Sequence, residues 1–443
     1  MKLIKHLYIH DRFYIYIAFI AVVFLLSFWF EPLYKLAWLL VLIVSILFLV
    51  DVFVLFRTNQ GIKARRLLPK KFSNSDENPV PITLKNNYPI QVFLKVVDEL
   101  PEQFQKRDFN YATALPPAVS RDFEYMVRPV DRGEYHFGSL NVFVSSALRI
   151  VARRYRFNAA QMVMVYPSYI QMRKYEFLAL SNRLTEFGLK KIRRLGHTME
   201  FEQIKNYVRG DDVRTINWKA TAKRGQLMVN QYQDEKSQPI YSLIDTGRVM
   251  KMPFEDLKLL DYAINATLAF SNIALLKNDK AGMLTFSKRI DTIIPASNKR
   301  THINVLNEAL YNVDTQFTDS DYSLLYATVK RKINHRSLLI LYTNFEHISA
   351  LKRQLPYILS LSKQHLVLII FFENTELDEL ISNPAEDLQQ VYHKTIAEKF
   401  AFDKRLMVKE LENRGIHAIL TKPQNLTVNV INKYLEFKSK GYI

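Results

Sequence analysis

The stretch Pro-Ile-Tyr-Ser-Leu-Ile-Asp (Pro239–Asp245) is a short, mostly apolar run that ends in an acid. Two later stretches, Ser337–Thr343 and His365–Phe372, have the same apolar character, and helix-like segments lie between the three. Near-continuous apolar strands that alternate with helices are typical of a mostly parallel sheet covered on both faces. We therefore predict a Rossmann-type α/β domain over residues 239–443.

The residues before this domain follow a different pattern. Between residues 62 and 166, short runs of alternating apolar residues are separated by turn residues such as Asn86-Asn87 and Pro116-Pro117. Period-two alternation with this punctuation favours a small β-sandwich. We predict a β-sandwich domain over residues 58–170, followed by a basic linker and a distinctive central block over residues 171–238.

The N-terminus contains two long apolar runs. Phe13–Phe30 has no charged residue, and Leu36–Phe56 is interrupted only by Asp51 near its end. Each run is close to the roughly 20 apolar residues that span a bilayer as a helix. The Glu31-Pro32 pair leaves a very short turn between them, so residues 1–57 are predicted to form a transmembrane hairpin, with Asp51 near the end where it can reach water.

The charge distribution gives the hairpin an orientation. The chain of 443 residues has 61 Lys and Arg against 43 Asp and Glu, a net charge of +18, and basic residues flank both outer ends of the hairpin. The positive-inside rule therefore puts both termini and the folded domains in the cytoplasm. Apposition to anionic lipid accounts for the basic excess, so no nucleic-acid partner is predicted. The chain has no cysteine, which excludes disulfides and thiol chemistry.

Asp245 is the candidate for chemistry, because ligands bind beyond the carboxyl ends of parallel strands. A hard cation needs several converging oxygen ligands, but Gly247 and Val249 offer no side-chain oxygen. Thr301 would add a hydroxyl, and Asn344 only a neutral carbonyl. The sequence predicts a degenerate pocket that binds a divalent cation weakly at most. The competing interpretation is that Asp245 caps the following turn.

The central block runs from Tyr207 to Glu235 and mixes acids, bases and aromatics densely. Gly210 permits a positive-φ turn, and Asp211 and Asp212 flank Arg214 closely enough for paired charges around Trp218. We favour a structural clamp between the sandwich and the α/β domain, with a docking surface for a partner as the alternative. The residues assigned to the block are Tyr207, Gly210, Asp211, Arg214, Trp218 and Glu235.

Two motifs carry a family resemblance. The run Arg132-Gly-Glu-Tyr and the block from Glu200 to Ala222, which contains Tyr-Val-Arg-Gly-Asp-Asp-Val-Arg-Thr-Ile-Asn-Trp-Lys-Ala, resemble the bacterial family catalogued as domain of unknown function 58. The order of hairpin, β-rich segment and α/β segment extends this resemblance over essentially the whole chain. It implies a C-terminal domain like von Willebrand factor type A and an association with AAA+ ATPases of the MoxR type. No enzymatic activity is established for the family.

The resemblance also bears on metal binding. The von Willebrand type A metal site uses an Asp-x-Ser-x-Ser run, a distant threonine and a further aspartate. Asp245 matches the first position, Gly247 and Val249 replace the serines, Thr301 is an uncertain match for the threonine, and Asn344 stands at the place of the second aspartate. The resemblance therefore implies the fold without its metal site.

Together these features predict a non-enzymatic adaptor in the bacterial inner membrane, with two passes and cytoplasmic domains. Its predicted partners are a MoxR-type AAA+ ATPase, other membrane or envelope proteins and the lipid itself, in an envelope or complex-assembly role. No cofactor is expected beyond a weakly bound divalent cation. The alternative is a metal-dependent hydrolase that acts at the membrane surface through Asp245.

Overall fold

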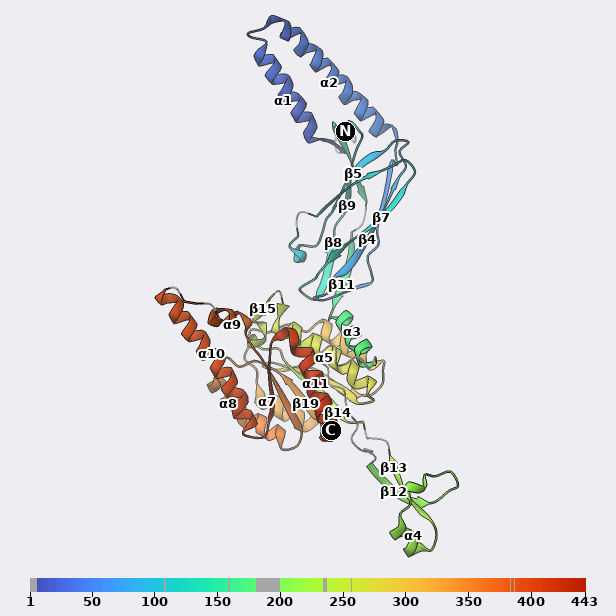
Figure 1. Ribbon diagram of the computed structural model, residues 1–443, viewed down its shortest axis with the longest axis vertical. Coiled ribbons are helices and arrows are strands. Elements are labelled where there is room, and N and C mark those ends of the chain that lie inside the picture. Colours follow the sequence, from blue (N-terminus) through green and yellow to red (C-terminus); the bar gives the residue numbers. More distant parts are fainter. Residues whose placement is uncertain are drawn as a thin grey trace. The chain divides into compact units, whose positions relative to one another are not determined.

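The computed structural model describes residues 6–443 except 107–108, 158–159, 181–199, 234–236, 256, 383 and 386. The chain divides into two compact units, Met1–Tyr166 and Pro167–Ile443 (Figure 1). The first unit contains a helical hairpin and β-sheets, and the second contains a mixed α/β domain.

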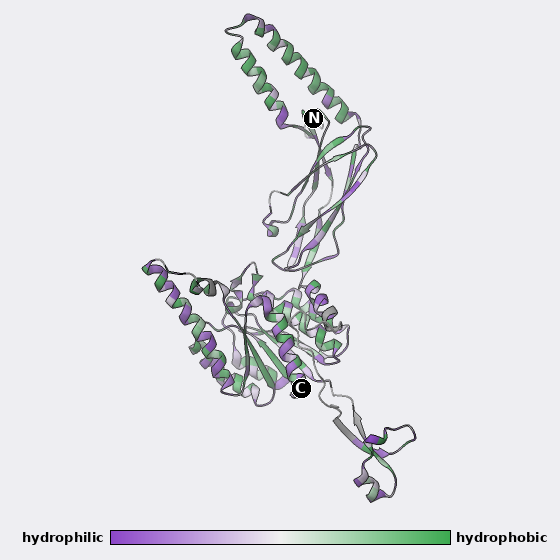
Figure 2. Cartoon of the chain, in the orientation of Figure 1, coloured by the Kyte–Doolittle hydropathy of each residue, from purple (hydrophilic) through white to green (hydrophobic). Residues whose placement is uncertain are grey.

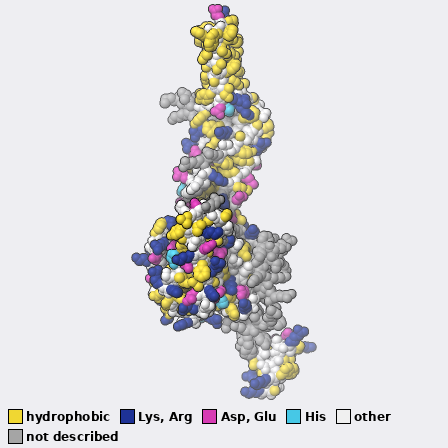
Figure 3. Space-filling model, turned by 60° about the vertical axis from the view of Figure 1, so that its left-hand side comes forward, with side chains coloured by type: hydrophobic (Ala, Val, Ile, Leu, Met, Phe, Trp, Pro, Cys, Tyr) yellow, Lys and Arg dark blue, Asp and Glu magenta, His cyan; other side chains and the backbone are white. Residues whose placement is uncertain are grey.

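The hairpin consists of helices α1 (Asp11–Leu26) and α2 (Glu31–Arg57). Helix α2 has 27 residues, and its most apolar stretch of 18 residues has a mean hydropathy of 3.2 and is only 11% buried. The helix is therefore long and apolar enough to cross a membrane. Figure 2 colours most residues of both helices as hydrophobic, and Figure 3 shows hydrophobic side chains over the visible face of the hairpin. The first predicted span was too long, since α1 ends at Leu26. The Glu31-Pro32 pair forms the first turn of α2 rather than the connection, because proline is well suited to that position.

Both ends of the hairpin meet one strand of the first unit, β10 (Val151–Phe157). Strand β1 (Leu7–Ile9), just before α1, pairs antiparallel with β10. From α2, Asp51 Oδ2 accepts hydrogen bonds from the backbone N–H groups of Ile150 and Val151, at 3.1 and 2.9 Å. Asp51 is fully buried, so the prediction that it reaches water was wrong. Its carboxylate instead satisfies backbone donors at the start of β10.

The last turn of α2 is held by the same strand. Arg153 Nη1 donates to the backbone oxygens of Leu55 and Thr58, at 2.6 and 2.7 Å. Tyr88 OH donates to Leu55 O at 2.8 Å. Helix C-termini leave unpaired carbonyls and carry partial negative charge, so the Arg153 guanidinium both caps α2 and complements its dipole.

The β-rich part of the first unit contains three sheets, with strand orders β1-β10-β9-β5-β6, β2-β4-β7 and β3-β11-β8. Buried and exposed residues alternate along strands such as β5, as the sequence pattern predicts for half-buried strands. The remaining strands are β2 (Ile62–Arg66), β3 (Lys71–Ser73), β4 (Asn78–Asn86), β5 (Val92–Asp98), β6 (Asn110–Leu115), β7 (Ser120–Val127), β8 (Gly133–Phe137), β9 (Leu140–Ser145) and β11 (Gln161–Tyr166).

The second unit is built on a six-stranded sheet of order β18-β17-β14-β19-β20-β21. All neighbouring pairs are parallel except β17 with β18, which is antiparallel at the edge. This matches the mixed α/β class predicted from the apolar runs. The strands are β14 (Pro239–Asp245), β17 (Lys280–Phe286), β18 (Ile290–Ser297), β19 (Leu338–Tyr342), β20 (Leu366–Phe372) and β21 (His417–Thr421).

Helices cover both faces of this sheet. Along β14, Ile240 and Ile244 pack into one core, while Tyr241 and Leu243 pack into the other. Helices α5, α6 and α11 contribute to the first core, and α7, α8 and α10 to the second. Their bounds are α5 (Leu259–Leu276), α6 (His302–Tyr311), α7 (Tyr322–Lys332), α8 (Ile348–Ser362), α9 (Thr375–Ser382), α10 (Leu388–Glu412) and α11 (Leu426–Ser439). Although α5 is as long and apolar as a membrane span, 89% of its most apolar window is buried, so it is a core helix.

One part of the predicted linker belongs to the α/β unit. Helix α3 (Tyr169–Leu180) packs on α5, where Met172 and Tyr175 lie against the first core. Asn272 Nδ2 on α5 donates to Glu176 Oε2 at 3.0 Å. The basic residues predicted to continue this linker, 181–199, lie outside the described residues.

Candidate functional site

The carboxyl end of β14 places Asp245 in a buried network of hydrogen bonds. Its Oδ1 accepts from Gly247 N at 2.8 Å and from the hydroxyl of Ser320. Its Oδ2 accepts from Thr343 Oγ1 at 2.7 Å and from Tyr322 OH at 3.4 Å. Burial raises the pKa of Asp245, and these hydrogen bonds oppose the rise. The carboxylate is thus surrounded by donors from its own chain, which agrees with the interpretation that Asp245 caps the turn after β14.

Gly247 has a structural reason for its lack of a side chain. A Cβ at this position would lie 2.3 Å from Ser320 Oγ, and 3.0 Å from both Asp245 Oδ1 and Thr318 O. The Ser320 hydroxyl therefore occupies the space that a serine at position 247 would need. Ser320 lies in the loop before α7, remote in sequence from Asp245, and the sequence reasoning missed it.

A hollow of about 210 Å³ surrounds Asp245 and includes Asn344, as predicted, together with Thr318 and Ser320. Thr301 is not part of its lining. Instead, Thr301 is exposed at the N-cap of α6. The assignment of Thr301 to the Asp245 pocket was wrong because the hydroxyls at this place come from the loop that precedes α7.

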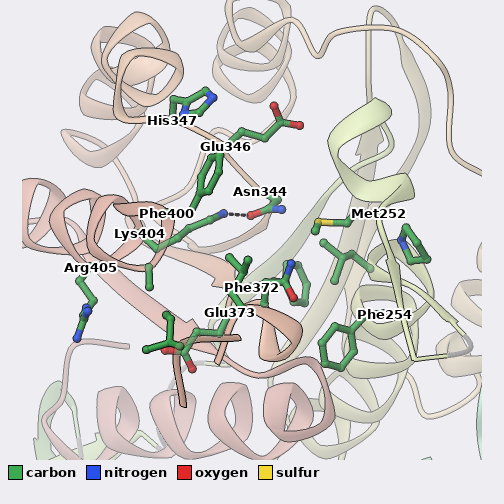
Figure 4. Close-up of a pocket in the computed structure, with 16 residues that line it drawn as sticks. Met252, Phe254, Asn344, Glu346, His347, Phe372, Glu373, Phe400, Lys404 and Arg405 are labelled. Atoms are coloured by element: carbon green, nitrogen blue, oxygen red, sulfur yellow. Dashed lines mark hydrogen bonds between the residues drawn. The ribbon is translucent and has the colours of Figure 1, made fainter. Parts of the chain in front are cut away.

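Asn344 connects this hollow to an unpredicted lysine. Lys404 on α10 donates from Nζ to Asn344 Oδ1 (Figure 4). Burial lowers the pKa of Lys404 to about 8, while the charge of Glu346 acts in the opposite direction. The burial of Lys404 could not be predicted from the sequence, because a single lysine in a charged amphipathic helix is usually exposed to solvent.

A larger cavity of about 490 Å³ lies beside the hollow, beyond the carboxyl ends of β19 and β20 (Figure 4). Asn344, Glu346 and His347 line both. Its other walls are mainly apolar, with a few polar groups, as is common in binding pockets. The remaining lining residues are Met252, Pro253, Phe254, Leu259, Phe372, Glu373, Asn374, Leu377, Ile381, Phe400, Ala401, Lys404 and Arg405. We call the hollow and the cavity together the crevice.

The crevice does not fit a divalent cation well. Within the described residues, no group of three or more His, Asp or Glu side chains is placed to hold a metal ion. Asp245 already accepts four hydrogen bonds, and the Lys404 ammonium is bonded to the oxygen of Asn344. A cation at Asn344 would therefore have to displace or repel this ammonium.

The central block folds as a hairpin of β12 (Glu200–Asn206) and β13 (Met228–Gln233), with the short helix α4 (Trp218–Arg224) between them. Tyr207 N donates to Leu227 O at 2.8 Å and extends the pairing. Gly210 has a φ of +117°, which agrees with the predicted turn. Glu235 lies outside the described residues.

The charge pair predicted for this hairpin was wrong. Asp211 Oδ1 bonds Lys205 Nζ at 3.0 Å, and its Oδ2 accepts from Val208 N at 3.0 Å. Arg214 bonds the neighbouring Asp212 only through its backbone N–H, at 2.9 Å, among the described contacts. Trp218 is 70% exposed rather than buried in an interface. The clamp between the β-sandwich and the α/β domain, and the docking surface that is its alternative, both stay predictions.

Parts of the chain are similar in sequence to known proteins. Residues 203–379 match the family described as "Protein of unknown function DUF58", and this confirms the family resemblance over that segment. A curated relative, "Uncharacterized protein YeaD" of Bacillus subtilis (strain 168), is 25% identical over 238 residues, 52% of this chain and 57% of that protein. The match thus spans little more than half the length of that relative.

Two solved structures show weak similarity. One is described as "Crystal structure of conserved hypothetical protein BatB from Bacteroides thetaiotaomicron", with 11% identity, a TM-score of 0.27, and coverage of 46% of this chain and 100% of that chain. The other is the "ASH / PapD-like domain of human CEP192 (PapD-like domain 7)", with 9% identity, a TM-score of 0.19, and coverage of 24% and 87%. Neither score supports a fold assignment, so the likeness to von Willebrand factor type A is not confirmed by them.

Proposed function

We propose that this protein is a membrane-anchored, non-enzymatic adaptor whose α/β domain holds a partner protein at the crevice. Helix α2 would supply the anchor, and the carboxyl edge of the sheet would supply the binding surface. The fold places this edge where mixed and parallel α/β sheets ordinarily bind ligands.

The observation that carries the proposal is the contrast between the two parts of the crevice. Asp245 is buried and already bonded by Ser320, Thr343, Tyr322 and Gly247, so it is poorly suited to act as a base or a metal ligand. The neighbouring cavity of about 490 Å³ has largely apolar walls and few polar groups. This combination favours binding over hydrolysis through Asp245.

For the partner we propose an AAA+ ATPase of the MoxR type, in an envelope or complex-assembly role. This partner class comes from the family resemblance of the central block. We further propose that the anchor lies in the bacterial inner membrane and that the α/β domain faces the cytoplasm, on the basis of the basic residues at both outer ends of the hairpin.

Affinity purification tests the partner. The tagged full chain would be crosslinked in cells of its native host, solubilised in detergent and analysed by mass spectrometry. We expect an AAA+ ATPase to be recovered with the unmodified chain and lost with Ala401→Trp, which fills the cavity. Val391→Trp is the matched control, because Val391 lies exposed on the same helix α10. Repeated purifications without an AAA+ ATPase would refute the proposed partner.

The absence of native cysteine permits a direct test of orientation. Ser27→Cys lies in the connection between α1 and α2, and Asn59→Cys follows α2. We expect a membrane-impermeant maleimide to label Ser27→Cys in spheroplasts, and Asn59→Cys only after the membrane is permeabilised. Labelling of Asn59→Cys in sealed spheroplasts would contradict the cytoplasmic placement.

A further inference from the structure

We propose that Lys404 makes the crevice a metal-independent receptor for a carboxylate of the partner protein, with an apolar side chain of the same peptide segment seated in the adjoining cavity. The inference rests on the proposed function, because the occupant is a segment of the protein that the adaptor holds. It adds the chemistry by which that segment is recognised.

The first argument concerns the hydrogen-bond partners of the Lys404 ammonium. An ammonium has three donors, and within the described residues the bond of Lys404 is the one to Asn344 Oδ1. That acceptor is neutral, and no described carboxylate forms an ion pair with Lys404. The charge of Glu346 acts on Lys404 without an ion pair between them, so the half-buried ammonium would gain a direct hydrogen bond to a charged acceptor if a carboxylate bound beside it. Charge complementarity thus favours an anionic group at this place.

The second argument is the geometry of the donors. Because Lys404 can only donate, Oδ1 of Asn344 must face it, and Nδ2 points elsewhere (Figure 4). No described acceptor is bonded to Nδ2. The ammonium keeps two further donors for a carboxylate, which forms short, strong bonds with a charged donor, and Nδ2 is a separate donor in the same crevice.

The third argument concerns the other charges of the cavity. Glu346 and Glu373 line it, and Arg405 lies next to Lys404 on α10. The two cations and the two carboxylates are equal in number, so a dianion such as phosphate would be repelled by Glu346 and Glu373 more strongly than a monoanion. The lining therefore favours a monocarboxylate over a phosphate.

The fourth argument identifies the occupant as a peptide. The cavity beside Lys404 is walled by side chains such as Phe254, Phe372 and Phe400, which suit an apolar group. The hollow that continues from it around Asp245 is lined by polar side chains, including Ser349 and Gln354. A peptide backbone can use such hydrogen-bonding groups, whereas the tail of a fatty acid cannot.

Fluorescence polarisation on the full chain in detergent micelles tests the inference. The probes are two labelled pools of short peptides in which an apolar residue (Leu, Ile, Val, Met or Phe) precedes either Glu or Gln. We expect the Glu pool to bind at least about tenfold more tightly, since a charged partner strengthens the hydrogen bonds of the ammonium. Lys404→Gln should remove this difference, and Lys404→Arg should keep most of it. Lys409→Gln, an exposed lysine of the same helix, is the matched control and should change nothing.

Four further results decide whether the inference stands. Binding of the Glu pool that is unchanged by EDTA supports a metal-independent site, and binding that requires Mg²⁺ overturns it. Equal binding of the two pools, or no effect of Lys404→Gln, also overturns the inference. Competition by decanoate but by neither peptide pool would assign the site to a lipid and overturn the peptide occupant. If an AAA+ ATPase still co-purifies with Lys404→Gln, the inference fails while the adaptor proposal stands. If no AAA+ ATPase co-purifies with the unmodified chain, the proposed partner itself is refuted.

Discussion

Substitution of Gly247 by alanine tests how tightly the Asp245 network is packed. The new Cβ would lie 2.3 Å from Ser320 Oγ, so the hydroxyl must move and its bond to Asp245 must weaken. Overpacking of this kind costs about 1–3 kcal/mol, and loss of a hydrogen bond to a charged group costs about 1.5–3 kcal/mol. The φ of Gly247 is −68°, which alanine adopts readily. Alanine also lowers the conformational entropy of the unfolded chain, which stabilises the folded state by about 0.4–1 kcal/mol. We expect a net loss of about 1.5–5.5 kcal/mol of local stability from these terms.

A second substitution separates the clash from other effects. Ser320→Gly removes the nearest atom that the new Cβ at position 247 would meet, while the contacts at 3.0 Å with Asp245 Oδ1 and Thr318 O remain. Gly247→Ala should therefore destabilise the Ser320→Gly variant less than it destabilises the unmodified chain, with a coupling of about 1–3 kcal/mol between the two sites. Hydrogen exchange of the full chain in detergent, followed by mass spectrometry of peptides from β14 and β19, measures the opening free energy locally. Additive effects of the two substitutions, or a Gly247→Ala variant as stable as the unmodified chain, would refute this account of the site.

Three further predictions concern other parts of the chain. Trp218→Ala should change stability by no more than about 0.5 kcal/mol in the same exchange measurement, because the side chain is 70% exposed; a loss of several kcal/mol would support the clamp. Arg153→Met should speed hydrogen exchange at the end of α2, since the C-terminal cap worth about 1–3 kcal/mol is lost; unchanged exchange there would contradict its role. Lys404 should titrate near pH 8 in ¹³C NMR of reductively methylated protein, with the resonance identified by its loss in Lys404→Gln. Because its folded pKa of about 8 lies below the ordinary lysine value of 10.5, the folded state binds fewer protons in this window, so stability should rise with pH from about 8 to 10.5 and less so in Lys404→Gln.

The sheet of the α/β unit was predictable because its strands are buried on both faces. Pro239–Asp245 forms β14 with the predicted bounds, and the later apolar runs form β19 and β20 within a few residues. A strand with apolar residues on both sides carries a signal that needs no knowledge of its neighbours. The position of Asp245 at a carboxyl edge follows directly from that strand.

The partners of Asp245 and the cation of the crevice were not predictable in the same way. Ser320, Tyr322 and Lys404 come from a loop and two helices whose approach to the sheet edge depends on tertiary packing. Thr301 was chosen instead because it was a hydroxyl at a plausible distance along the chain, yet it lies at the N-cap of α6. Trp218 was assigned to a clamp between the two domains or to a docking surface, and its 70% exposure in the hairpin could not be predicted from the sequence.

The proposed carboxylate site needs no metal ion, although the family resemblance places the metal site of von Willebrand factor type A at the same edge of the sheet. At Asp245, the space of a serine at position 247 is taken by Ser320, and the carboxylate is satisfied by donors of the chain. At Asn344, where the family resemblance implies a second acid, a neutral amide accepts from Lys404. Replacement of an acid by an amide removes a negative charge that would otherwise pair with the lysine. The positive charge of Lys404 is therefore left available to a ligand, so that the chain itself can supply the cation with which a metal site would attract a carboxylate.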